Sequence, residues 1–288
     1  MVHPMSDEED TMDDLDPAEL LEQAAEALDA GESEIAAKIY NAAGNIFMSV
    51  AEFEEALDSF EKSLELYEEL KEETGIADTY YNLGVAHINL ENWIEADEML
   101  QSSIEMFEKS SNEEGVADAT YALALAKLGK GEFDTAMDFF KQAQKAYRTA
   151  NNEQGQASVI MDMGNAYADK EDWTKAEKTF KNALKIYKEL DDKGGIADAL
   201  SLLGDIAEIN NNQKKAAEYF TEAAECYLEA EIYDISLEVV ERAEAKMWDI
   251  PKSTRRRLRK RCDAVRDTLP EDIEDEDDDD FDEDLLDF

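Results

Sequence analysis

The stretch Glu72–Asp78, "EETGIAD", returns along the chain at a fixed interval. Related phrases stand at 113–118 ("EEGVAD"), 155–158 ("GQAS") and 195–198 ("GIAD"), so the glycine recurs every forty residues. The phrase itself contains no nucleophile, no metal-ligand spacing and no phosphate-binding loop. Self-similarity at a constant period is the signature of a repeat architecture, and this stretch therefore decides the fold.

Five columns of residues keep their character when the chain is read in steps of forty. The columns are Gly44, Gly84, Ala124, Gly164 and Gly204; Phe53, Trp93, Phe133, Trp173 and Gln213; Ala56, Ala96, Ala136, Ala176 and Ala216; Phe60, Leu100, Phe140, Phe180 and Phe220; and Tyr67, Phe107, Tyr147, Tyr187 and Tyr227. Within a copy, apolar residues follow the i, i+3, i+4, i+7 spacing of a helix, and no alternation typical of strands occurs. We predict an all-α fold, an α-solenoid of five helix-turn-helix repeats in which the small residues let neighbouring backbones approach closely.

Two segments carry a family resemblance. Leu83-Gly84-x-x-His87 is followed by Trp93 and Ala96, and Met163-Gly164-x-x-Tyr167 is followed by Trp173 and Ala176. This pattern resembles the tetratricopeptide repeat, in the lengthened forty-residue class found in peptide-docking adaptor proteins. The resemblance covers about 35–234. Lys127 and Gln213 stand where the family prefers an aromatic residue, and we expect looser packing in the fifth copy because of Gln213.

The predicted organisation has five kinds of segment in chain order. They are an acidic leader at 1–15, a capping helix at 16–34, repeats at 35–74, 75–114, 115–154, 155–194 and 195–234, capping helices with a basic block at 235–270, and an acidic tail at 271–288. The leader and the tail are too acidic to bury a core and are predicted to be disordered.

The family resemblance implies that the first helix of each repeat lines an inner, concave face. A polar and aromatic stripe on these helices supplies candidate groove residues: Asn41, Asn45, Tyr81, Val85, Asn89, Tyr121, Leu125, Met161, Asn165, Asp169, Ser201 and Asp205. Asparagine amides can pair with an extended peptide, tyrosines offer rigid contact area, and the acids toward the C-terminal end suit a basic residue. The alternative is a set of solvated helix faces. The stripe holds no lysine or arginine, which argues against clamping the anionic C-terminus of a heat-shock chaperone.

A basic block follows Pro251 in an otherwise acidic chain: Arg255, Arg256, Arg257, Arg259, Lys260 and Arg261. Leu258, Cys262 and Val265 fall at helical spacing beside it, which predicts an amphipathic end helix with Ser253 or Thr254 as its N-cap. The arginines could bind nucleic acid, or they could neutralise an adjacent acidic surface.

The acidic tail ends in four apolar residues interleaved with acids: Phe281, Leu285, Leu286 and Phe288. On a helix these residues share one face, as in short motifs that fold into a partner's groove. Three interpretations stay open: a solvating tail, a docking motif for a basic, apolar-lined partner, and docking onto the chain's own basic block.

The composition of the chain also disfavours several classes of function. The 73 acids and 28 bases give a net charge of −45, which disfavours nucleic acid and anionic membranes and favours basic partners or simple solubility. Cys226 and Cys262 match no disulfide or zinc pattern, and His87 shares a column with packed aromatic residues, so we predict no enzyme, no cofactor and no metal. No apolar run reaches membrane-spanning length and the start of the chain is acidic, so we expect a cytoplasmic protein.

The function predicted from the sequence is a non-enzymatic scaffold or adaptor that binds a protein or peptide segment in its groove, with the tail as a second docking motif. Two alternatives from other classes are a nucleic-acid-associated factor that uses 255–261 and an acidic chaperone or nucleic-acid mimic for basic proteins.

Overall fold

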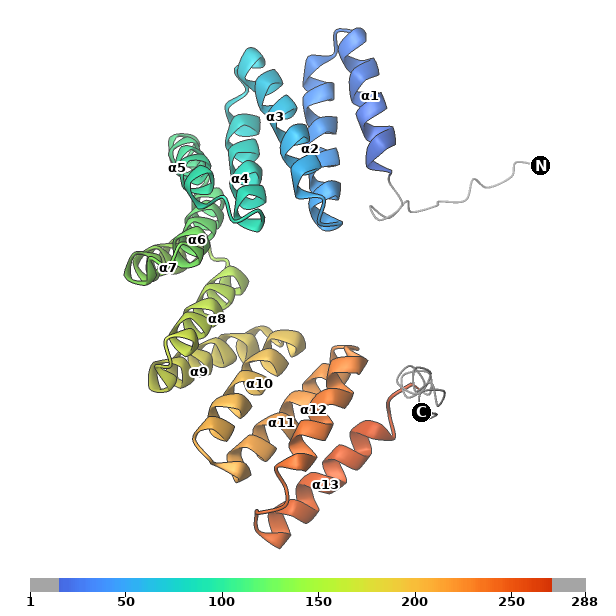
Figure 1. Ribbon diagram of the computed structural model, residues 1–288, viewed down its shortest axis with the longest axis vertical. Coiled ribbons are helices and arrows are strands. Elements are labelled where there is room, and N and C mark those ends of the chain that lie inside the picture. The colour runs from blue at the N-terminus through green and yellow to red at the C-terminus, as the bar shows by residue number, and fades with distance from the viewer. Residues whose placement is uncertain (1–15, 271–288) are drawn as a thin grey trace, which may run out of the picture. The chain divides into compact units, whose positions relative to one another are not determined.

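The computed structural model describes residues 16–270, which form α-helices and turns without strands in that range (Figure 1). The chain divides into two compact units, one ending at Asn152 and the other beginning at Glu153. The first unit holds α1 (Pro17–Asp29), α2 (Ser33–Ser49), α3 (Phe53–Leu70), α4 (Glu73–Asn89), α5 (Trp93–Ser110), α6 (Glu113–Gly129) and α7 (Phe133–Thr149). The second holds α8 (Glu153–Asp169), α9 (Trp173–Leu190), α10 (Lys193–Ile209), α11 (Gln213–Glu229), α12 (Tyr233–Ala245) and α13 (Lys252–Arg266). The predicted all-α fold of repeated helical pairs is confirmed.

Every connection between the regularly spaced helices uses one residue in the left-handed backbone conformation. These residues recur every twenty positions: Gly31, Ala51, Lys71, Glu91, Ser111, Gly131, Asn151, Glu171, Asp191, Asn211 and Glu231. A left-handed residue lets the next backbone N–H groups turn back onto the last carbonyls of the helix, as Glu72 N–H does onto the Tyr67 carbonyl at 3.0 Å. The backbone repeat is thus twenty residues, half the sequence repeat, because the two helices of a pair end in the same way.

Glycines occupy two distinct contact positions, and both require the absence of a side chain. A β-carbon on Gly84 would lie 2.5 Å from the Leu100 side chain, in the contact between α4 and α5. One on Gly75 would lie 2.6 Å from the Tyr67 ring, in the contact between α3 and α4. The predicted close approach is confirmed at both positions, because distances below 3 Å leave no room for a methyl group.

Three of the recurring glycines also have their N–H groups capped by the side chain three residues before them. Glu72 accepts from Gly75, Asn112 Oδ1 accepts from Gly115 at 3.0 Å, and Asp192 Oδ1 accepts from Gly195 at 2.9 Å. Helices α4, α6 and α10 therefore begin two residues before their glycines. The repeat boundaries predicted at the glycines lie just inside these helices.

The two departures from the family pattern are both accommodated. Lys127 is buried and its Nζ donates to Asp97 Oδ2 at 2.8 Å, so an ion pair between α6 and α5 fills the place of an aromatic ring. The expectation of looser packing near Gln213 is wrong, because Phe220 and Ala216 in the same helix are fully buried. The guanidinium of Arg242 also lies 4.2 Å from the centre of the Phe220 ring.

The second unit ends in a sixth helical pair instead of isolated caps. Helix α12 begins forty residues after α10, and α13 packs against both α11 and α12. Leu258, Cys262 and Val265 of α13 are buried in the unit's core, as the helical spacing predicted. The predicted N-cap is wrong: Pro251 is the N-cap and Ser253 already lies inside the helix, because proline fixes the extended backbone that precedes a helix start.

Candidate peptide-binding groove

An open cavity of about 620 Å³ lies in the first unit, along the adjacent helices α2, α4 and α6. Asn41, Asn45 and Tyr81, which the sequence singled out, line it. Asp78 and Asn82 lie beside them. The remaining lining comes from Lys38, Ala42, Tyr67, Phe107, Asn112, Glu114, Gly115 and Asp118. Its volume falls within the range of small-ligand pockets, and its polar lining suits a segment of main chain.

Three asparagine side chains form a connected network on this wall. Asn41 Oδ1 accepts from Asn82 Nδ2 at 3.0 Å and from Asn45 Nδ2 at 3.3 Å. Asn41 Nδ2 in turn donates to the hydroxyl of buried Thr79 at 3.2 Å, and that hydroxyl donates to the Gly75 carbonyl at 2.7 Å. Asn41 is held in place by these bonds, whereas the Oδ1 atoms of Asn45 and Asn82 accept no hydrogen bond within residues 16–270. The network therefore fixes amides of two neighbouring helices and leaves the Oδ1 atoms of Asn45 and Asn82 as acceptors without a partner among the described residues.

The other groove candidates of the first unit lie outside this network. Tyr121 is partly buried, with its ring centre 6.2 Å from that of Phe140 and 6.4 Å from that of Tyr147. Val85 and Leu125 are partly buried, and Asn89 is exposed with its amide donating to the carbonyl of Val85 at 2.9 Å. These side chains support the helices and do not line the cavity.

The second unit holds the remaining five candidates. The prediction that Met161 lines a groove is wrong: its side chain is 9% exposed, because it packs in the hydrophobic core of the second unit. The prediction that Asp205 receives a basic residue of a partner is also corrected. Arg242 of α12 already donates to the Asp205 carboxylate, so no basic partner residue is needed there. Asn165 Nδ2 bonds Asp162 Oδ1 at 3.3 Å, while Ser201 is partly buried and Asp169 is exposed. The structure does not gather these five side chains around a described cavity.

A pairing between helices escaped the sequence analysis. In the third repeat the Tyr147 hydroxyl donates to Asp118 Oδ1 at 2.5 Å, and in the fifth repeat Tyr227 donates to Asp198 Oδ1 at 2.6 Å. The two residues are 29 positions apart in both cases. The corresponding pairs elsewhere are Lys38 with Tyr67, Asp78 with Phe107, and Ser158 with Tyr187. The signal was available, because the aspartate is the last letter of the recurring phrase and the tyrosine column had been identified.

In the second repeat the aspartate faces a phenylalanine, so its usual donor is missing. The carboxylate of Asp78 has no hydrogen-bond or ion-pair partner among the described side chains. Asp78 is an exposed residue, but the cavity wall partly desolvates its carboxylate and raises its pKa, and the nearby Glu72 raises the pKa further. Burial also raises the pKa of Asp118, but there the Tyr147 hydroxyl acts in the opposite direction by stabilising the carboxylate.

The remaining candidate chemistry is structural. His87 is partly buried, and burial lowers its pKa as expected for a packed neutral imidazole. Cys226 and Cys262 are free thiols, and burial raises the pKa of Cys226 to about 11, which disfavours the reactive thiolate. Residues 16–270 contain no group of three or more potential ligands that could hold a metal. None of the helices in that range combines the length and the apolar character needed to cross a bilayer.

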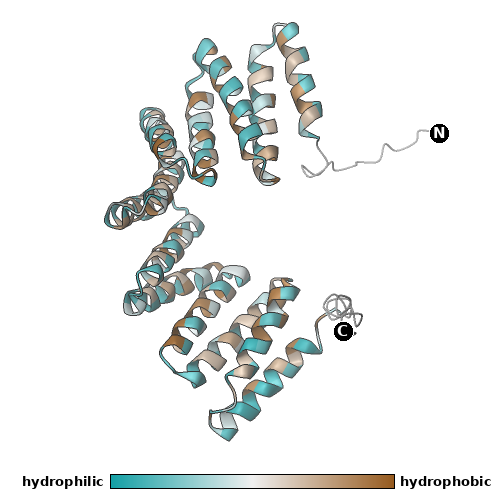
Figure 2. Cartoon of the chain, in the orientation of Figure 1, coloured by the Kyte–Doolittle hydropathy of each residue, from teal (hydrophilic) through white to brown (hydrophobic). Residues whose placement is uncertain are grey.

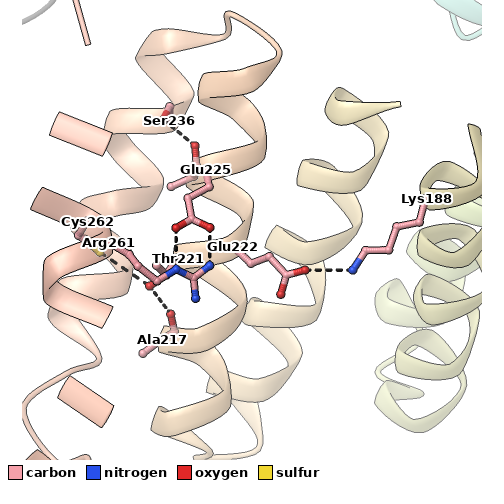
Figure 3. Close-up of polar contacts among 9 residues, drawn as sticks. Lys188, Ala217, Thr221, Glu222, Glu225, Ser236, Arg261 and Cys262 are labelled. Carbon is pink, nitrogen blue, oxygen red and sulfur yellow. Dashed lines mark hydrogen bonds and ion pairs between the residues drawn. The ribbon is translucent and has the colours of Figure 1, made fainter. Parts of the chain in front are cut away.

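The basic block lies on α13, a mostly hydrophilic helix (Figure 2). Arg261 forms a forked pair with both carboxylate oxygens of Glu225 (Figure 3). Arg257 donates to Glu218 at 2.9 Å. These bonds hold α13 against α11, as the neutralising interpretation expects for two of the six residues. Arg256, Arg259 and Lys260 are exposed, and Arg255 is partly buried. The apolar tail residues from Phe281 to Phe288 lie outside the described part of the chain.

Comparisons with known proteins agree with this architecture. A tetratricopeptide repeat model matches 75–149 and 155–229, and a second one matches 37–70. No curated protein matches the chain. Among solved structures, BtubC from P. vanneervenii superposes with a TM-score of 0.63 at 18% identity, covering 75% of this chain and 89% of that one. The apo form of RapI superposes with a TM-score of 0.62 at 14% identity, covering 79% of this chain and 82% of that one. A Rap protein complexed with Competence and Sporulation Factor superposes with a TM-score of 0.53 at 13% identity, covering 88% of this chain and 79% of that one.

Proposed function

Because the chain belongs to the tetratricopeptide repeat family, we propose that it is a non-enzymatic scaffold that binds an extended segment of a partner protein in the groove of its first unit. The observation that carries the proposal is the asparagine network of Asn41, Asn45 and Asn82 on the wall of the 620 Å³ cavity. Ordered amides that neighbour one another on the first helices of successive repeats can pair with the N–H and C=O groups of a peptide main chain.

The energetics favour a peptide over a compact small molecule. Asn41 is already ordered by its bonds to Thr79 and Asn82, so less side-chain entropy is lost when a ligand binds. The lining is polar and open along three helices, which suits a segment that enters and leaves the groove. The fold of the chain is similar to that of a Rap protein solved in complex with Competence and Sporulation Factor, which is consistent with binding a partner, and at 13% identity this likeness concerns the fold alone.

Selection from a displayed library of random twelve-residue peptides, with the full chain as bait, tests the proposal. We expect binding sequences whose affinity falls about tenfold or more in the double variant Asn45→Ala, Asn82→Ala, since each lost hydrogen bond contributes about 0.5–1.5 kcal/mol. The matched control is Asn89→Ala, which removes an exposed amide of the same unit outside the cavity. Equal losses in both variants, or no selected sequence at all, would contradict the groove.

We propose the acidic tail as a second docking element that is independent of the groove. Its motivation is the alternation of acids with Phe281, Leu285, Leu286 and Phe288. Deleting 271–288 is expected to leave the affinity of the selected groove peptides within twofold while removing a separate set of partners in affinity purification. If the chain without residues 271–288 keeps every partner, the proposal of a second docking element is wrong.

A nucleic-acid role for α13 is disfavoured by the same contacts that attach this helix. Arg257 and Arg261 pair with Glu218 and Glu225, and the chain's net charge of −45 repels phosphate. The charge-only alternative is a generic binder of basic proteins. It predicts that the Asn82→Ala substitution leaves the affinity unchanged, because a neutral amide contributes nothing to net charge, whereas the groove proposal predicts a loss of affinity.

A further inference from the structure

We propose that the groove of the first unit selects partner segments by an arginine or lysine side chain that binds the carboxylate of Asp78. This proposal rests on the groove function and specifies its chemistry. It starts from a comparison of the chain with itself: repeats three and five satisfy the same aspartate with a tyrosine hydroxyl, and repeat two does not. The missing donor is the para-hydroxyl that Phe107 lacks.

The position of Asp78 places the unsatisfied carboxylate where a ligand can reach it. Asp78 and Phe107 both line the cavity, as do Asn82 and Tyr81 on the same helix as Asp78. Asp78 is exposed, whereas Phe107 is 3% exposed, so the carboxylate and not the ring is offered to a partner. A peptide held by the asparagine amides would therefore present one side chain to Asp78.

The other charges around the cavity are already occupied. Asp118 accepts from Tyr147, and Glu114 accepts from Asn152 Nδ2 at 2.9 Å. Lys38, the one cation in the lining, is paired with Glu34 at 2.6 Å. With three carboxylates and one ammonium group in the lining, the local charge is negative, and the net charge of −45 adds a long-range attraction for cations.

A basic side chain satisfies this arrangement better than a neutral donor. Its charge compensates a carboxylate that the cavity wall partly desolvates, and its apolar stem can lie along the half-buried ring of Tyr81. An anionic segment, such as a free carboxyl terminus, would meet the unpaired Asp78 and be repelled. The predicted partner is therefore an extended segment with one arginine or lysine at a fixed place between residues that pair through their main chain.

The test uses the random twelve-residue peptides selected by the full chain. We expect arginine or lysine to be enriched at one position, and Asp78→Asn to weaken the best such peptide by about three- to tenfold, since Asp78 keeps solvent exposure. The charge-matched control is Asp198→Asn, which removes the same residue from the same column of the second unit, where Tyr227 already satisfies it.

Phe107→Tyr gives a second test without a change of charge. Tyrosine occupies this column in the other four repeats, so the fold should tolerate it, and its hydroxyl should donate to Asp78 as Tyr147 does to Asp118. A fall in the Asp78 pKa, measured by NMR titration, would report the new bond, and peptide affinity should fall with it.

The outcomes separate the two proposals. If peptides are selected and depend on Asn45 and Asn82, but show no basic preference or lose equal affinity in Asp78→Asn and Asp198→Asn, the role of Asp78 is overturned and the groove stands. If no peptide depends on the two asparagines, the groove fails and the role of Asp78 fails with it.

Discussion

At the scale of single residues, the glycine columns show how the repeat is held at a close helix spacing. Gly84→Ala would place a methyl group 2.5 Å from Leu100, so α4 and α5 must separate or Leu100 must leave its rotamer. We expect a loss of about 1–3 kcal/mol in the free energy of unfolding, despite the better helix propensity of alanine. Urea unfolding followed by circular dichroism measures it.

Gly194→Ala is the matched control for that substitution. Gly194 also lies in a helix, but a β-carbon added there would have Asp192 Oδ1 as its nearest neighbour, at an ordinary contact distance of 3.6 Å. The variant should match the natural chain or exceed it by up to about 1 kcal/mol, since helix propensity alone then acts. A Gly84→Ala chain as stable as Gly194→Ala would show that the column is not a steric requirement.

At the same scale, some residues of the candidate site could be predicted from the sequence and others could not. Asn41 and Asn45 were found because helical spacing places them on one face of a predicted helix. Asp78 was missed because its meaning depends on a partner 29 residues away, and because the informative feature is the hydroxyl that Phe107 lacks. Met161 and Asp205 were misplaced, since a stripe on one helix does not tell which neighbour covers it.

At the scale of elements, the helix ends contain backbone strain that lowers the free energy of unfolding and that the sequence did not indicate. Ala51 adopts a φ of 61° at the end of α2, in the left-handed region that β-carbons disfavour. Ala51→Gly should therefore raise the free energy of unfolding by about 0.5–1 kcal/mol, because alanine has no side-chain contact beyond its methyl group to lose. The urea midpoint is the measurement.

Gly131→Ala is the reciprocal variant. Gly131 has a φ of 83° and open space around it, so the substitution tests backbone strain without a steric clash. We expect a loss of about 1 kcal/mol. A shift of the two variants in the same direction would disprove the account of these turns. The helical pairs themselves were predictable from periodicity, but nine of these eleven turn residues are not glycine, so composition gave no signal for the twenty-residue backbone repeat.

At the scale of the whole molecule, the excess of 45 negative charges opposes folding, because the native chain holds them closer together than the unfolded chain does. Raising NaCl from about 0.02 M to 0.5 M shortens the screening length from roughly 20 Å to about 4 Å, so the repulsion should weaken. We expect the melting temperature to rise by several degrees, a gain of about 1–3 kcal/mol.

Lowering the pH should act in the same direction and reduce the salt effect. Burial raises the pKa of Asp78, Asp118 and Asp205, so the native state binds more protons than the unfolded state between pH 3.8 and their native pKa values. The contribution of these carboxyls to stability then increases as the pH falls through that window, whereas His87, whose pKa is lowered, opposes the trend below its unfolded value of 6.5. Melting curves at pH 7.5 and 5.5, each at both salt concentrations, should show the larger salt response at pH 7.5. A response that is equal at the two pH values would mean that salt acts through ion binding or hydration and not through the charge of the carboxylates.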